Sequence, residues 1–237
     1  MSDRFARRRM LGRLSRLRLL LIAVGLVVVV TFGGWVVWFS SWVAVRNVEV
    51  VGARHIDVRE LEQVAAVELG MPLARLDLSA VEGRLEQLPA VDVAVVERSW
   101  PHGVTIRITE STPVAALLDD GGYIALNAEG ELFRQLPRGP SRLPVVRADQ
   151  LEAERRAAAL AEVAEVVSSL APAIAAKVDH VEVASPDSIM LALRNGDQVE
   201  WGSAAASERK AVVLAALLHL DATVYDVRVP EQPATRS

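Results

Sequence analysis

The chain has 237 residues, a formal net charge of −4 and no cysteine. Seven arginines and one acidic residue, Asp3, precede Leu19, so the first 18 residues are net +6 and the remainder is net −10. A basic tail on an acidic body argues against nucleic acid as the main partner, because phosphate binding needs a basic face on the folded part. The lack of cysteine excludes disulfides and thiolate chemistry, and the chain is long enough to bury a core without them.

An uncharged apolar run, residues 19–39, follows the basic tail of residues 1–18. It has about the 20 apolar residues needed to cross a bilayer, and three tryptophans around its end suit an interfacial aromatic belt: Trp35, Trp38 and Trp42. A signal peptide is the alternative, but its apolar region is usually only about 7–15 residues long. We therefore expect an uncleaved, single-pass transmembrane helix. The arginines place the N-terminus in the cytoplasm and the bulk of the chain outside it, a type II topology.

Residues 45–113 have the pattern of a small α+β domain. Residues 45–51 predict a strand that ends at Gly52, and two amphipathic helices follow, one capped by Asp57 and the other by Asp77 or Ser79. Two half-buried antiparallel strands come next, because apolar residues alternate with polar or small ones. The alternating apolar residues are Val91, Val93 and Val95, then Val104, Ile106 and Ile108.

The tetrapeptide Trp100-Pro101-His102-Gly103 separates these two strands. Proline and glycine supply turn chemistry, and proline cannot donate to a strand ladder. We therefore interpret the stretch as a hairpin turn and not as a site, with Trp100 covering the edge of the sheet and His102 exposed. A metal site would need three or four converging ligands, and His102 has no neighbouring ligand in the sequence.

Residues 114–230 predict a mostly antiparallel β domain with two helices. Three short strands are separated by turn signals at 120–122 and 127–130, and a helix follows over 150–170. Strands at 180–184 and 188–194 lead to Asn195-Gly196, a type I′ hairpin signal. Ser207 is the expected cap of a second helix. The strand "TVYDVRV", residues 223–229, is expected to be the last, with a free edge, followed by Pro230 and a disordered tail, residues 231–237.

The order strand, helix, helix, strand, strand directly after an anchor resembles the POTRA domain of the FtsQ/DivIB family of bacterial division proteins. The residues that carry this resemblance are Gly52, Pro89, Val91, Arg98, Trp100, Pro101, Glu110, Pro113, Val114 and Ala115. The second half is similar to the β domain of the same family, with Lys210 and Tyr225-Asp226 where the family commonly has a lysine and an aromatic-acid pair.

The resemblance implies a scaffold at the division septum that binds FtsB- and FtsL-type proteins and, through them, regulates the septal synthases FtsW and FtsI. It places the FtsB site on the last strand, where an arginine, here Arg228, pairs with a partner carboxylate. The implied partner-binding residues are Tyr225, Asp226, Val227, Arg228, Val229 and Glu231.

The sequence contains no nucleophile-elbow, zinc-protease or P-loop motif. We therefore predict no catalytic residues, no metal and no cofactor, and no nucleic acid or small-molecule substrate. A membrane-anchored cell-wall hydrolase is the alternative, and it would need a pocket with convergent polar groups. An outer-membrane assembly factor would need a barrel of many alternating strands after the POTRA domain, for which the chain is too short.

Overall fold

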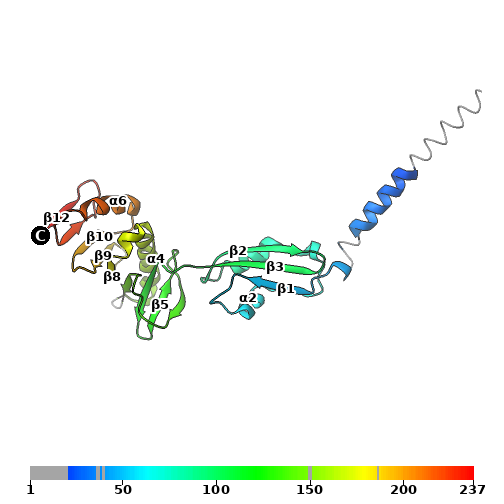
Figure 1. The fold of residues 1–237 in the computed structure, drawn as a ribbon, viewed down its shortest axis with the longest axis horizontal. Coiled ribbons are helices and arrows are strands. Elements are labelled where there is room, and N and C mark those ends of the chain that lie inside the picture. Colours follow the sequence, from blue (N-terminus) through cyan, green and yellow to red (C-terminus); the bar gives the residue numbers. More distant parts are fainter. Residues whose placement is uncertain (1–20, 36–37, 39–40, 149–150, 186) are drawn as a thin grey trace, which may run out of the picture. The chain divides into compact units, whose positions relative to one another are not determined.

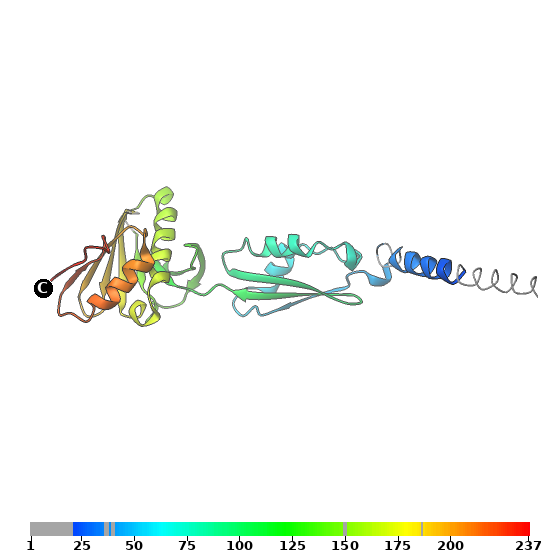
Figure 2. The same cartoon turned by 90° about the horizontal axis from the view of Figure 1, so that it is seen from above.

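The structure, a computed structural model, describes residues 21–35, 38, 41–148, 151–185 and 187–237. These residues form two compact units (Figure 1 and Figure 2). One contains the described residues up to Leu85 together with Ala94–Ile108, and the other contains the described residues of Glu86–Val93 and Thr109–Ser237.

The apolar run is helical over residues 21–35, and its large side chains are exposed. Within the described part of the chain, no helix is both long enough and apolar enough to cross a bilayer. Five residues of the predicted transmembrane helix, 19, 20, 36, 37 and 39, lie outside the described residues, as does the basic tail. The three tryptophans are exposed, by 57%, 52% and 77% for Trp35, Trp38 and Trp42.

The first unit has the predicted order of strand, helix, helix, strand, strand. Its elements are β1 (Asn47–Val51), α2 (Val58–Ala65), α3 (Leu78–Leu85) and most of β2 (Val91–Ser99) and β3 (Gly103–Glu110), whose residues 91–93 and 109–110 belong to the second unit. The strands lie in the order β1-β3-β2, with β1 parallel to β3. The side chain of Asp57 accepts the N–H of Arg59 at 2.9 Å, and that of Asp77 accepts the N–H of Ala80 at 3.2 Å, so both predicted aspartate caps are confirmed.

The sheet of this unit has one buried face, formed by Val104, Ile106 and Ile108 of β3, as the alternation predicts. The expected pattern for β2 is wrong, because Ala94 and Val96 are buried there while Val93 and Val95 are exposed. Val91 is buried as well. Val91 and Ala94 are three residues apart, so the two-residue period of a regular strand is broken between them and every later side chain changes face.

The tetrapeptide after β2 forms the predicted turn, but its side chains lie differently. Trp100 is 53% exposed, so it covers the sheet edge in part at most. His102 is half-buried rather than exposed. Its carbonyl accepts the N–H of Arg46 at 2.8 Å, so this turn holds the chain that enters β1.

The second unit is a nine-stranded sheet covered on one face by helices (Figure 2). Its strands are β4 (Ala115–Asp119), β5 (Gly122–Leu126), β6 (Leu132–Leu136), β7 (Val145–Arg147), β8 (Val178–Ser185), β9 (Ser188–Leu193), β10 (Gln198–Gly202), β11 (Val224–Asp226) and β12 (Ala234–Arg236). The helices are α4 (Ala153–Ser169), α5 (Pro172–Ala175) and α6 (Ser207–Leu217). The spatial order is β12-β11-β10-β9-β8-β7-β4-β5-β6. Neighbouring strands are antiparallel except for β4–β7, β7–β8 and β10–β11, so the domain is mostly antiparallel, as predicted.

Trp201 of β10 is fully buried in the core between sheet and helices. Its Nε1–H donates to the hydroxyl of Ser207 at 3.3 Å, and that hydroxyl donates to the carbonyl of Ala204 at 2.6 Å. The predicted cap is therefore wrong. Ser207 is the first residue of α6 and bonds to the core, while the cap position is held by Ala206 in the left-handed conformation.

The hairpin between β9 and β10 is present, but its turn is not type I′. Type I′ needs positive φ at both central residues, and here Gly196 has φ +96° while Asn195 does not have positive φ. The N–H of Gly196 donates to the carbonyl of Leu193 at 2.9 Å. The N–H of Leu193 donates to the carbonyl of Asp197 at 2.8 Å. This is a three-residue loop that ends in a left-handed glycine.

Two glycines with positive φ allow the cost of backbone strain to be distinguished from the cost of close packing. A Cβ on Gly130 would lie 2.3 Å from the Cα of Ala161 in α4, whereas a Cβ on Gly196 would meet nothing within 4 Å. We expect Gly196→Ala to cost about 1–2 kcal/mol through the left-handed backbone alone. Gly130→Ala should cost roughly 1–3 kcal/mol more, because α4 must also move. Urea unfolding of both variants measures the difference, and equal losses would contradict the close approach of α4.

Candidate partner-binding surface

β11 is shorter than the predicted final strand. It covers three residues and pairs in parallel with β10, Tyr225 lying opposite Val199. After Asp226 the chain turns, and the backbone N–H of Arg228 donates to the side chain of Asp226 at 3.1 Å. This local bond ends the strand, because Asp side chains commonly bind the backbone two residues on.

The tail that the sequence predicts to be disordered contains a strand. β12 pairs antiparallel with β11, with Arg236 opposite Val224, Thr235 opposite Tyr225 and Ala234 opposite Asp226. The N–H of Thr223 also donates to the carbonyl of Arg236 at 2.8 Å. The expectation of a free edge on β11 is therefore wrong as well, because the chain's own C-terminal segment covers that edge.

Four charged side chains form a cluster at this end of the sheet. The guanidinium of Arg228 donates to Asp226 through Nε at 3.0 Å and Nη2 at 2.6 Å, and Nη2 lies 2.9 Å from a carboxylate oxygen of Glu200. The second carboxylate oxygen of Glu200 bonds to Arg236 of β12. The hydrogen bond from Arg228 lowers the pKa of Asp226 despite its partial burial. The two arginines balance the charges of the two carboxylates. Arg228 therefore already has two carboxylate partners, Asp226 and Glu200, within its own chain.

The six predicted partner-binding residues fall into three groups. Tyr225 and Val227 are buried and hold this end of the sheet from the core side. Asp226 and Arg228 belong to the charged cluster. Val229, which is 54% exposed, and Glu231 lie on the connection between β11 and β12, where Glu231 pairs with Arg209 of α6 at 2.5 Å. The structure thus places all six at one end of the sheet but gives them different roles.

Sequence reasoning missed Glu200 and Arg236, the members of the cluster that come from β10 and β12. A signal for Glu200 was present: it stands between Val199 and Trp201, both fully buried, so alternation directs its side chain to the opposite face. Arg236 had no such signal, since a three-residue strand is too short to show a period.

Lys210 of α6 is 2% exposed, although lysine is almost never fully buried unless it is paired. Its ammonium donates to the carbonyls of Trp201 at 3.0 Å and Ser203 at 2.8 Å. Burial lowers the pKa of Lys210, and the opposing effect of Glu162 is smaller. The lysine therefore ties α6 to the end of β10, the strand on which β11 and the charged cluster depend.

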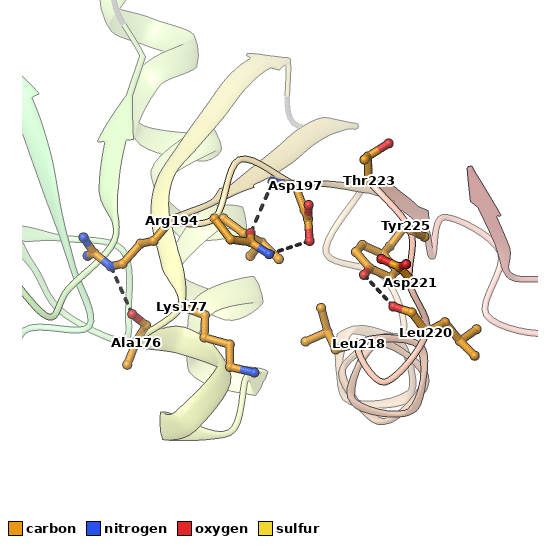
Figure 3. A pocket seen from close by; sticks show the side chains of 12 residues that line it. Ala176, Lys177, Arg194, Asp197, Leu218, Leu220, Asp221, Thr223 and Tyr225 are labelled. Atoms are coloured by element: carbon orange, nitrogen blue, oxygen red, sulfur yellow. Dashed lines mark hydrogen bonds between the residues drawn. The ribbon is translucent and has the colours of Figure 1, made fainter. Parts of the chain in front are cut away.

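A groove of about 540 Å³ lies near the N-terminal end of β11 (Figure 3). Its walls come from the end of α5, the β9–β10 turn and the segment that joins α6 to β11. The lining includes Lys177, Asp197 and Asp221 but no histidine, serine or cysteine. It thus offers no Ser–His or Cys–His pair of the kind used in acyl transfer.

Comparisons with known proteins agree in both halves of the chain. Residues 43–111 match the family of FtsQ-type POTRA domains, and residues 115–230 match the family described as "Cell division protein FtsQ/DivIB, C-terminal". The chain is 34% identical to "Cell division protein FtsQ" of Streptomyces collinus over 93% of its length and 88% of the relative's. It is 36% identical to the protein of the same name from Streptomyces venezuelae, over 94% and 85%. The solved structure of the major extracytoplasmic domain of DivIB from Geobacillus stearothermophilus aligns with a TM-score of 0.36 at 19% identity. The alignment covers 45% of this chain and 87% of the DivIB chain, and the likeness is weak.

The lowered pKa of Lys210 has a consequence for stability at alkaline pH. Between that pKa and the ordinary value of 10.5, the unfolded chain binds more protons at this lysine than the folded chain does. The free energy of unfolding should therefore rise with pH in this interval, and Lys210→Met should remove the rise. Urea unfolding of both proteins across a pH series up to about 10.5 measures it. A difference between them that is independent of pH would show that Lys210 titrates alike in both states.

Proposed function

Because the chain belongs to the FtsQ/DivIB family of cell division proteins, we propose that it is a non-enzymatic scaffold of the division machinery. In this proposal the scaffold is anchored in the cytoplasmic membrane by residues 19–39. Its β domain holds FtsB- and FtsL-type partners outside the cytoplasm at the septum, and through them it regulates the synthases FtsW and FtsI.

The observation that carries the proposal is the end of the nine-stranded sheet at β11 and β12. β11 and the residue after it rest on the core through Tyr225 and Val227, while the strand that the structure describes on its outer edge is β12, whose three residues are exposed. Strand addition at such an edge gives affinity through main-chain hydrogen bonds, and neighbouring side chains give specificity. Glu200, Asp226 and Arg228 of the charged cluster supply such side chains.

The membrane anchor is supported by the charge pattern. Seven arginines precede an uncharged run that is helical over its described residues 21–35. A protease added to spheroplasts from outside should therefore digest the two folded units and spare the arginine-rich tail. Release of the folded units as a soluble protein would instead show that the run is a cleaved signal.

Arg228 provides the test of the partner site. Arg228→Glu would place a third carboxylate beside Glu200 and Asp226, so the local shape and charge of the edge should change. We expect binding of an FtsB-type segment to the full-length chain to weaken at least tenfold, or about 1.4 kcal/mol. The free energy of unfolding should change by only about 1 kcal/mol or less, because exposed ion pairs contribute little to stability.

Arg107→Glu is the matched control, because Arg107 is similarly exposed and pairs with Glu97 at 3.7 Å in the POTRA domain. This control should leave binding of the FtsB-type segment unchanged. Titration by calorimetry compares the two variants with the unmodified chain. Equal affinity of all three would put the partner site elsewhere on the molecule.

A further inference from the structure

We propose that β12 is an exchangeable strand that occupies the partner site of its own chain. Residues 234–236 cover the edge of β11 until an extended segment of a partner, running antiparallel to β11, displaces them. This inference rests on the proposed function, because it concerns the same edge. It adds a regulatory step, since binding requires the release of β12.

The hold of β12 on the sheet is weak. All three of its residues are exposed, so no apolar side chain anchors it. Its contacts with the sheet are the backbone pairing with β11, the bonds between Thr223 and Arg236, and the ion pair of Arg236 with Glu200. The Arg236 side chain is 62% exposed in that ion pair, and exposed ion pairs contribute little. Segments with few buried contacts open at low free energy.

β11 remains in place when β12 leaves, because its own contacts are buried. Tyr225 is 3% exposed and donates its hydroxyl to the carbonyl of Leu220 at 3.1 Å. Val227 is fully buried, and its N–H donates to the carbonyl of Glu200 at 3.0 Å. Release of β12 would therefore expose a preformed strand edge, the template that strand addition requires.

The connection between β11 and β12 can act as a tether. It spans residues 227–233, contains Pro230 and Pro233, and has a tight turn in which the N–H of Gln232 donates to the carbonyl of Val229 at 2.9 Å. A tethered strand rebinds as an intramolecular ligand at high effective concentration. A partner must therefore offer more contacts than β12 does in order to displace it.

The geometry indicates what those contacts are. In the register of β12, the position opposite Val224 carries Arg236, which reaches Glu200; a partner strand should place a basic residue there. A strand longer than β12 would continue past Thr223 toward the groove of Figure 3, whose lining includes Leu218, Leu220 and Thr223. We infer that the partner segment has a basic residue opposite Val224, and that its continuation meets a groove with both charged residues, such as Lys177 and Asp221, and apolar ones.

A reversible cross-link tests the exchange. Val224 and Arg236 are directly opposite, and such cross-strand positions come close enough for a disulfide after modest adjustment. The chain has no cysteine of its own, so Val224→Cys with Arg236→Cys gives one disulfide at most. In the full-length chain, the oxidised form should bind an FtsB-type segment at least tenfold more weakly than the reduced form. Arg236→Cys alone, which loses the ion pair but cannot lock, should not respond to oxidation.

A second probe does not depend on the identity of the partner. A labelled peptide with the sequence of residues 229–237 should bind a chain that ends after Gln232, whose edge is vacant, and bind the unmodified chain at least tenfold more weakly. Failure of the peptide to bind the shortened chain would overturn the exchange.

The two probes separate the two proposals. If the FtsB-type segment binds the oxidised and reduced forms equally, binding does not require the release of β12 and the exchange is wrong, while the partner site is decided by the Arg228→Glu variant. If that segment binds none of the forms while the tail peptide binds the shortened chain, the exchange stands and the proposed partner is wrong.

Discussion

Glu200 is the residue on which the end of the β domain depends. Its carbonyl accepts the N–H of Val227, and its carboxylate pairs with both Arg228 and Arg236. One residue of β10 thereby fixes the exit of β11 through the backbone and the position of β12 through the side chain. Its orientation follows from its neighbours, because Val199 and Trp201 both point into the core and force the intervening carboxylate to the other face.

The core beneath β10 makes this arrangement rigid on one face of the sheet. Trp201 is fully buried, and its ring nitrogen bonds to Ser207 at the start of α6, while Lys210 of the same helix bonds to the carbonyls of Trp201 and Ser203. Unpaired polar groups at this depth would be costly. These bonds therefore define how α6 sits on the sheet. The opposite side of β10 and β11 carries the charged cluster and has no comparable anchoring.

The contrast between the two sides of β11 explains how one end of a sheet can serve both folding and binding. The inner contacts of Tyr225 and Val227 are apolar and buried, and they keep the strand in place. The outer contacts with β12 are exposed backbone pairs and one ion pair, which screening by salt weakens. A free edge would invite association with other chains. A weakly held strand of the same chain protects it while leaving it accessible to a competitor.

Elements with local sequence signals could be predicted without the structure. Asp57 and Asp77 cap their helices, and Val104, Ile106 and Ile108 form a buried face, because capping and strand alternation act over a few neighbouring residues. The family resemblance placed Tyr225, Asp226 and Arg228 together on the last predicted strand of the sheet.

Which groups meet there depends on the folded chain. The bonds of Glu200 to Arg228 and Arg236 join residues distant in the sequence, and β12 is too short to show a period. The face that β2 presents and the exposure of Trp100 were likewise decided by packing. Local propensity cannot encode such contacts, because their free energy comes from partners that only the folded chain brings within reach.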